Sequence, residues 1–151
     1  VGESTLNVDS PAVFLPVTVA HELAHQRGVA AEQEANFVSV MAATAGGNAA
    51  YQYSGWLFGY LHLSNALYSA DPDLARASYA ALCAEAQADM ADNNAYWKQW
   101  EGPVKETGEK VYTAFLQGYG QELGMRSYGA CVDLLVEEFL PYTTTGGLTA
   151  E

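Results

Sequence analysis

The five residues His21-Glu22-Leu23-Ala24-His25 place the strongest constraint on this chain. They lie in an apolar, helix-forming stretch, PVTVAHELAHQRG. On a helix, residues four apart share one face with their Cβ atoms about 5–6 Å apart, so the two imidazoles can share a metal ion. Glu22 can then reach a metal-bound water as general base. The plainer interpretation is two histidines and a glutamate solvated on a helix face.

A third metal ligand is expected downstream, because a catalytic zinc usually takes three protein ligands and keeps a fourth position for water. His62 is the one other histidine, so a carboxylate is the expected ligand. Glu32 is preferred, because Asn36 follows four residues later on the same helical face and can accept the free ring N–H of a ligating histidine. Glu34 is the alternative. In a helix it points about 200° away from Glu32, so only one of the two can be a ligand.

Gly28 lies between the histidine pair and these glutamates. Glycine adopts a left-handed, helix-ending conformation without steric penalty. We therefore predict that the first helix ends just past His25 and that the chain folds back to bring Glu32 to the metal.

These residues resemble a known class of enzymes. The motif His21-Glu22-x-x-His25, followed by Glu32-x-x-Ala35-Asn36, is similar to that of the gluzincin metallopeptidases. In gluzincins a downstream glutamate is the third zinc ligand, and an Asp or Asn four residues later braces a zinc-binding histidine. One departure is that six residues separate the second histidine from the glutamate, where better-known gluzincins have many more.

Three longer strings, TVAHELAHQRGVAAEQEANF, YSGWLFGYLHLSNALY and SYGACVDLL, resemble a bacterial membrane-anchored family known as domain of unknown function 3810. The resemblance is close over residues 16–41 and weaker over most of the remaining chain. It implies transmembrane helices upstream of this chain. Together with the gluzincin motif, it implies the following roles: His21, His25 and Glu32 as zinc ligands, Glu22 as general base, and Asn36 as a brace behind a ligand.

The helix signals predict an all-α fold, a bundle of about six helices. Pro16 suits a first helical turn, Gly46-Gly47 a helix end, and Asn48 and Asp71-Pro72 helix starts. The expected helices cover about 16–27, 30–45, 48–69, 71 to past 90, 104–119 and 127–140. The stretch 89–101 can continue the fourth helix or form a surface turn. The alternative is an α+β fold with one short edge strand over Thr5–Val8.

Composition limits the class of protein and its partners. The 151 residues suit one domain, 1–151, and half of them are apolar with 16% charged, as in a folded protein. The net charge of −12 argues against nucleic acid and anionic membrane surfaces as partners. Because the chain starts at Val1 without a signal-peptide pattern, we expect a soluble piece of a longer membrane protein, whose side of the membrane the sequence leaves open.

Other residues are candidates for supporting roles. Tyr128 is the first candidate to stabilise an oxyanion, as a downstream Tyr or His does in gluzincins, and Tyr60 is the second. His62 is expected to be a satisfied core or boundary histidine, with a substrate or oxyanion role as the alternative. Cys83 and Cys131 are expected to be two buried free thiols, with a single disulfide as the alternative.

The preferred function is zinc-dependent peptide hydrolysis, in which Zn²⁺ activates a water, Glu22 takes its proton, and a peptide or protein is the substrate. A non-catalytic zinc-binding sensor or regulatory domain is the main alternative. A third interpretation is a helical interaction domain in which the H-E-x-x-H motif is fortuitous.

Overall fold

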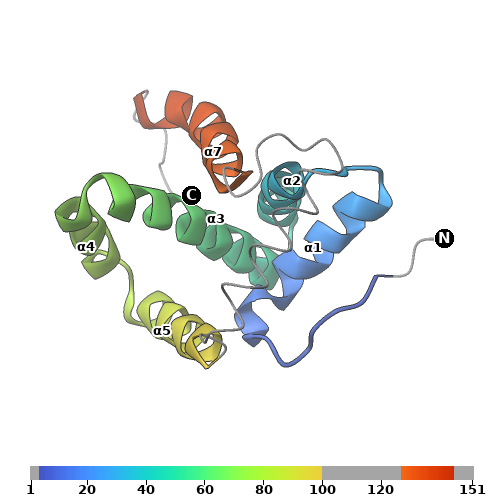
Figure 1. The fold of residues 1–151 in the computed structure, drawn as a ribbon, viewed down its shortest axis with the longest axis horizontal. Helices are drawn as coiled ribbons and strands as arrows, with labels where there is room; N and C mark the ends of the chain where they lie inside the picture. Colours follow the sequence, from blue (N-terminus) through green and yellow to red (C-terminus); the bar gives the residue numbers. More distant parts are fainter. Residues whose placement is uncertain (1–3, 100–126, 145–151) are drawn as a thin grey trace.

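The computed structural model describes residues 4–99 and 127–144 (Figure 1). Within these residues the fold is all-α, with a short 3-10 turn, six α-helices and no strand, which confirms the predicted helical bundle. The elements are η1 (Ala12–Phe14), α1 (Leu15–Gln26), α2 (Glu32–Ala45), α3 (Ala49–Ala70), α4 (Pro72–Ala80), α5 (Ala84–Lys98) and α7 (Ser127–Thr144). The helix predicted over 104–119 lies outside the described residues.

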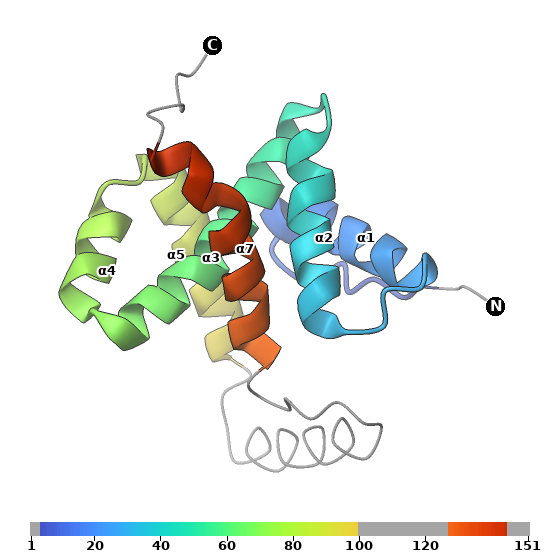
Figure 2. The ribbon, with the colours of Figure 1, turned by 90° about the horizontal axis from the view of Figure 1, so that it is seen from above.

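The long helix α3 is the centre of the arrangement. Helices α1 and α2 pack against it and against each other, α4 contacts its C-terminal half, and α7 lies over α2 and α3 (Figures 1 and 2). Two apolar clusters fill the interior. One joins η1, α1, α2, α3 and α5, and the other joins α2 and α7. Their buried members are Phe14, Val17, Ala43, Leu57, Ala86 and Met90 in the first, and Val40, Cys131 and Leu135 in the second.

Two predicted helix starts are confirmed by their capping bonds. The side chain of Asn48 accepts hydrogen bonds from the backbone N–H groups of Ala50 and Tyr51, at 2.9 and 3.3 Å. Asp71 caps α4 in the same way, and Pro72 takes the first helical position. Each side chain satisfies amide groups that have no partner within the helix.

The prediction of one helix from 71 to past Met90 is wrong, because α4 ends at Ala80 and α5 begins at Ala84. The side chain of Gln87 donates to the carbonyl of Leu82 at 2.8 Å, and Tyr79 donates its hydroxyl to the Gln87 carbonyl at 3.0 Å. These bonds hold the turn between the two helices. Helix α5 then continues to Lys98, so the described part of the stretch that begins at residue 89 is helical almost throughout.

The edge strand over Thr5–Val8, which the sequence offered as the alternative, does not form, since these residues are irregular or in a turn. Asn7 accounts for the local structure. Its side-chain oxygen accepts from the Asp9 N–H at 3.1 Å, and its amide donates to the Tyr96 hydroxyl at 2.8 Å. These bonds curl the segment into an Asx turn, which competes with an extended strand.

Cys83 and Cys131 are both free thiols, as expected. Cys131 is buried, but Cys83 is exposed, so the expected burial of Cys83 is wrong. Its position explains the exposure, because it occupies the N-cap of α5 at the turn between α4 and α5.

Helices α2 and α3 approach each other closely through glycines. A Cβ atom on Gly55 would lie 2.8 Å from the Cβ of Ala43 and 3.0 Å from Cγ2 of Thr44. One turn later, a Cβ on Gly59 would lie 3.4 Å from Val40. The two helices therefore make a close contact at this glycine pair. The contacts also give the register, with later residues of α3 meeting earlier residues of α2.

Candidate metal centre

Helix α1 brings the two histidines of the motif together. Pro16 lies in its first turn, and the last turn ends at Gln26. His21 and His25 are one turn apart, with their Nε2 atoms 3.0 Å from each other and their rings edge to face at 4.6 Å. Both side chains are partly buried, at 16% and 26% exposed.

The turn after α1 is built on Gly28, the one described residue with a positive φ, at +97°. The Gly28 N–H donates to the His25 carbonyl at 3.0 Å, and the Val29 N–H donates to the Ala24 carbonyl at 3.1 Å. This pair of bonds is the Schellman motif, which ends a helix and reverses the chain. The predicted role of Gly28 is therefore confirmed.

The same turn fixes the orientation of a histidine ring. The Val29 carbonyl lies 2.7 Å from Nδ1 of His25. A carbonyl can only accept, so Nδ1 carries the proton and the lone pair of Nε2 faces the cluster. The sequence interpretation missed Val29. The signal that predicts it is Gly28, because a Schellman turn returns the next residue to the last helical turn.

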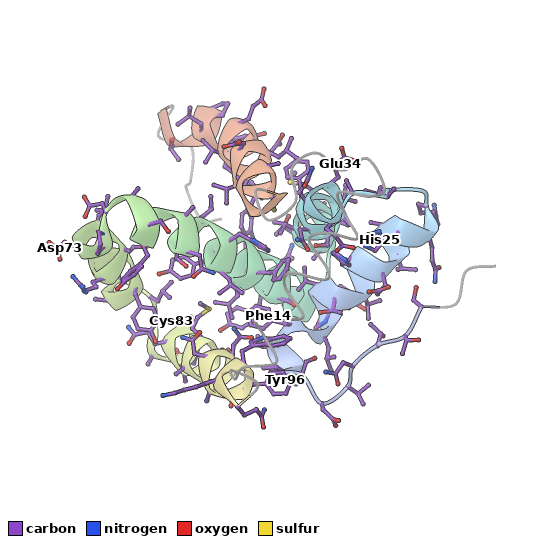
Figure 3. All side chains as sticks on the ribbon, in the orientation of Figure 1. Phe14, His25, Glu34, Asp73, Cys83 and Tyr96 are labelled. Carbon is purple, nitrogen blue, oxygen red and sulfur yellow. The ribbon has the colours of Figure 1, made fainter. Side chains whose placement is uncertain are left out.

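Glu32, the first residue of α2, completes the cluster. Its Oε2 lies 3.3 Å from Nε2 of His21, and its Oε1 lies 3.4 Å from Nε2 of His25. The hydrogen bond with His21 lowers the pKa of Glu32 from its ordinary value of 4.5, against the opposing effect of partial burial. Glu34 is exposed and does not belong to the cluster. In Figure 3 it projects from α2 on the side away from α1, whereas His25 lies where the two helices meet.

The three side chains have a spacing that suits one metal ion. Zinc bonds to nitrogen and oxygen of about 2.0–2.2 Å in a tetrahedron place neighbouring ligand atoms about 3.3 Å apart. The observed separations of 3.0, 3.3 and 3.4 Å lie around this value. Within the described ranges, these three residues are also the one group of three His, Cys, Asp or Glu side chains whose ligand atoms converge. The donor set therefore fits zinc.

Glu22, which follows His21 in the chain, and Asn36, four residues after Glu32, are both half-buried. Among the residues that the structure describes, the Glu22 carboxylate has no hydrogen bond or ion pair, so it is available to a ligand. The Asn36 side chain likewise has no hydrogen bond there, while its backbone carbonyl accepts from the Ser39 hydroxyl at 2.7 Å. The bracing of a zinc-binding histidine by Asn36 stays a prediction.

The side chain of Tyr60 belongs to the described part of the structure, and that of Tyr128 does not. Tyr60 lies away from the cluster, because its hydroxyl accepts a 3.5 Å hydrogen bond from Ser78 of α4. The backbone of Tyr128 belongs to the first turn of α7, but its side chain lies outside the described part.

His62 is not the satisfied core histidine that was expected. Its Nε2 is buried and has no hydrogen-bond partner among the described residues, although its ring packs edge-on against Phe58 with centroids 4.6 Å apart. Burial lowers the pKa of His62, and the charge of His21 lowers it further. The ring therefore lies close enough to the cluster to be affected by its electrostatic field.

Comparison with known proteins places the chain in a family. No curated protein and no solved structure matches it. The profile of one family, described as protein of unknown function (DUF3810), matches residues 1–136. Since this match covers nearly the whole chain, including α1, α2 and the three clustered side chains, the chain belongs to the DUF3810 family.

Proposed function

We propose that this protein is a zinc-dependent peptidase in which His21, His25 and Glu32 hold the metal. The observation that carries the proposal is the convergence of two Nε2 atoms and a carboxylate at 3.0, 3.3 and 3.4 Å. The Val29 carbonyl adds to it, because it keeps the lone pair of His25 directed at the same point.

The chemistry follows from the neighbouring side chains. When bound, zinc supplies a Lewis acid that polarises a carbonyl and lowers the pKa of water toward neutrality. Glu22 follows His21 on the helix, and its carboxylate has no partner among the described residues, so it is free to act as the base. It accepts the proton of the attacking water and returns it to the leaving amine.

Two observations favour a catalytic over a purely structural zinc site. A structural zinc usually has four protein ligands, whereas three converge here among the described residues. The Glu32 side chain is also 41% exposed, so the cluster is open on one side. A regulatory zinc domain is the alternative that the experiment below has to exclude.

The test compares wild-type protein, Glu22→Gln, and Glu34→Gln as a control that removes an exposed carboxylate two residues beyond Glu32. We expect about one zinc per chain in all three by elemental analysis. Cleavage of a diverse peptide pool should fall by about 10²–10⁴-fold in Glu22→Gln and remain in Glu34→Gln. Failure to bind added zinc would refute the proposal, as would wild-type cleavage that survives in Glu22→Gln. Zinc binding with no cleavage by any variant would favour the regulatory alternative.

The proposal includes a peptide or protein substrate and membrane attachment through segments outside this chain. None of the described helices combines the length and hydropathy needed to cross a bilayer. The charge of −12 makes cationic segments the favoured substrates and nucleic acid a poor partner.

A further inference from the structure

A cavity of about 490 Å³ with a mixed polar and apolar wall lies between the C-terminal half of α3 and the first turns of α7. This volume falls within the range of about 300–1,000 Å³ that is usual for ligand pockets. The polar side chains in its wall are His62, Asn65, Ser69 and Asp133. No lysine or arginine lines it, and Asp133 is the one carboxylate among its lining residues.

Several polar groups of the wall have free hydrogen-bonding capacity. Asp133 is exposed and has no hydrogen bond or ion pair among the described residues. The Ser69 hydroxyl donates to the Asn65 backbone carbonyl at 3.2 Å, which leaves its oxygen free to accept. The buried Nε2 of His62 has no partner in the described protein.

His62 also connects the cavity to the metal centre. Gly55 faces Ala43 and Gly59 faces Val40, so a further turn along α3 brings His62 opposite the turn of α2 that carries Asn36. Asn36 is one turn from Glu32. The cavity therefore lies on the α3 side of the metal cluster.

The geometry points to this cavity as a specificity pocket for a lysine or arginine side chain of the peptide substrate, with Asp133 as its counter-charge. The inference rests on the proposed peptidase function. A basic side chain has an apolar stem and a tip with only donors. The apolar part of the wall suits the stem, and an ammonium or guanidinium group pairs with the Asp133 carboxylate. The charge of −12 acts in the same direction, because it attracts cationic peptides before they bind.

The test uses two acetylated, amidated peptides that differ only in lysine or norleucine at one position. Binding is followed by the amide resonances of Asn65, Ser69 and Asp133 and by the ring resonances of His62. It is measured in zinc-loaded and in chelated protein. We expect the lysine peptide to bind about two- to fivefold more tightly, as a solvent-accessible ion pair allows, with a smaller preference at high salt.

Two variants make the test specific. Asp133→Asn should abolish the preference for lysine. Glu137→Gln, which removes an exposed acid of α7 outside the cavity, should retain it. Equal affinities for the two peptides, a preference that survives in Asp133→Asn, or no saturable shift at the cavity would each overturn the inference. If zinc does not bind but the preference is present and depends on Asp133, the peptidase proposal fails and the cavity stands as a site for basic side chains.

Discussion

The two ends of α2 make contacts of opposite kinds. At its N-terminus, Glu32 meets His21 and His25 in a polar, partly exposed cluster whose members are held mainly by turn and helix geometry. Toward its C-terminus, Ala43 is buried against Gly55 at a distance that leaves no room for another methyl group. One end offers reactive groups to solvent, and the other packs tightly.

The difference shows how a small helical protein can keep a reactive site. Polar groups gathered at one point contribute little stability on their own, because each loses hydration when it approaches the others. The tightly packed apolar contact between α2 and α3 compensates for this small contribution, because it holds α2 rigidly in place. Glu32 is then positioned by packing that lies about two to three helical turns away.

The largest expected effect is at the polar end of α2. Glu32→Gln should lower zinc affinity by more than about 100-fold, because loss of a ligand exceeds the 10–100-fold loss typical of the residues behind it. Glu34→Gln is the matched control, since it makes the same change two residues away on an exposed side chain. Competition with a zinc chelator measures both affinities. Equal losses in the two variants would contradict the assignment of Glu32.

A smaller effect is expected at the packed end. Gly55→Ala should lower the free energy of unfolding by about 1–3 kcal/mol, because the added methyl group meets Ala43 and Thr44 and the helices must separate. Gly47→Ala is the control. A Cβ there has nothing within 4 Å, so its effect should stay within about 0.5 kcal/mol. Urea unfolding of both variants checks this. If Gly55→Ala were as stable as wild type, the tight contact would not be a source of stability.

Local signals in the sequence predicted much of the fold and the cluster. The i, i+4 spacing determines which side chains share a helix face, so His21 and His25 followed from the motif alone. Gly28 marked the reversal. The angle between positions 32 and 34 on a helix allowed only one of the two glutamates in the cluster, and Asn36 four residues later favoured Glu32. The predictions of Asn48 and Asp71 as helix caps were correct, because each side chain accepts hydrogen bonds from amide groups in the first turn of the helix that it caps.

The wrong predictions concern contacts that local sequence signals do not indicate. The break between α4 and α5 depends on Gln87 reaching back to Leu82, in a stretch whose residues all tolerate a helix. The state of His62 depends on the register of α3 against α2, which is set by contacts distant in sequence. A periodic pattern can predict a buried face, but not whether a polar atom on that face finds a partner.

The smallest expected effect tests His62, which lies between the two regions. His62→Phe should raise the free energy of unfolding by up to about 1 kcal/mol, because it removes an unsatisfied buried nitrogen and retains an aromatic ring against Phe58.

The pH dependence of this difference gives a second check. Burial lowers the pKa of His62 in the folded protein below its ordinary value of 6.5. Below that pH the unfolded chain binds a proton that the folded chain does not, so the wild type loses stability as the pH falls. Phenylalanine cannot titrate, and the advantage of His62→Phe should therefore grow as the pH falls from above to below 6.5. Urea unfolding on both sides of that pH measures it. A variant less stable than wild type at both would mean that Nε2 of His62 has a partner in the folded protein and that its interaction is stabilising.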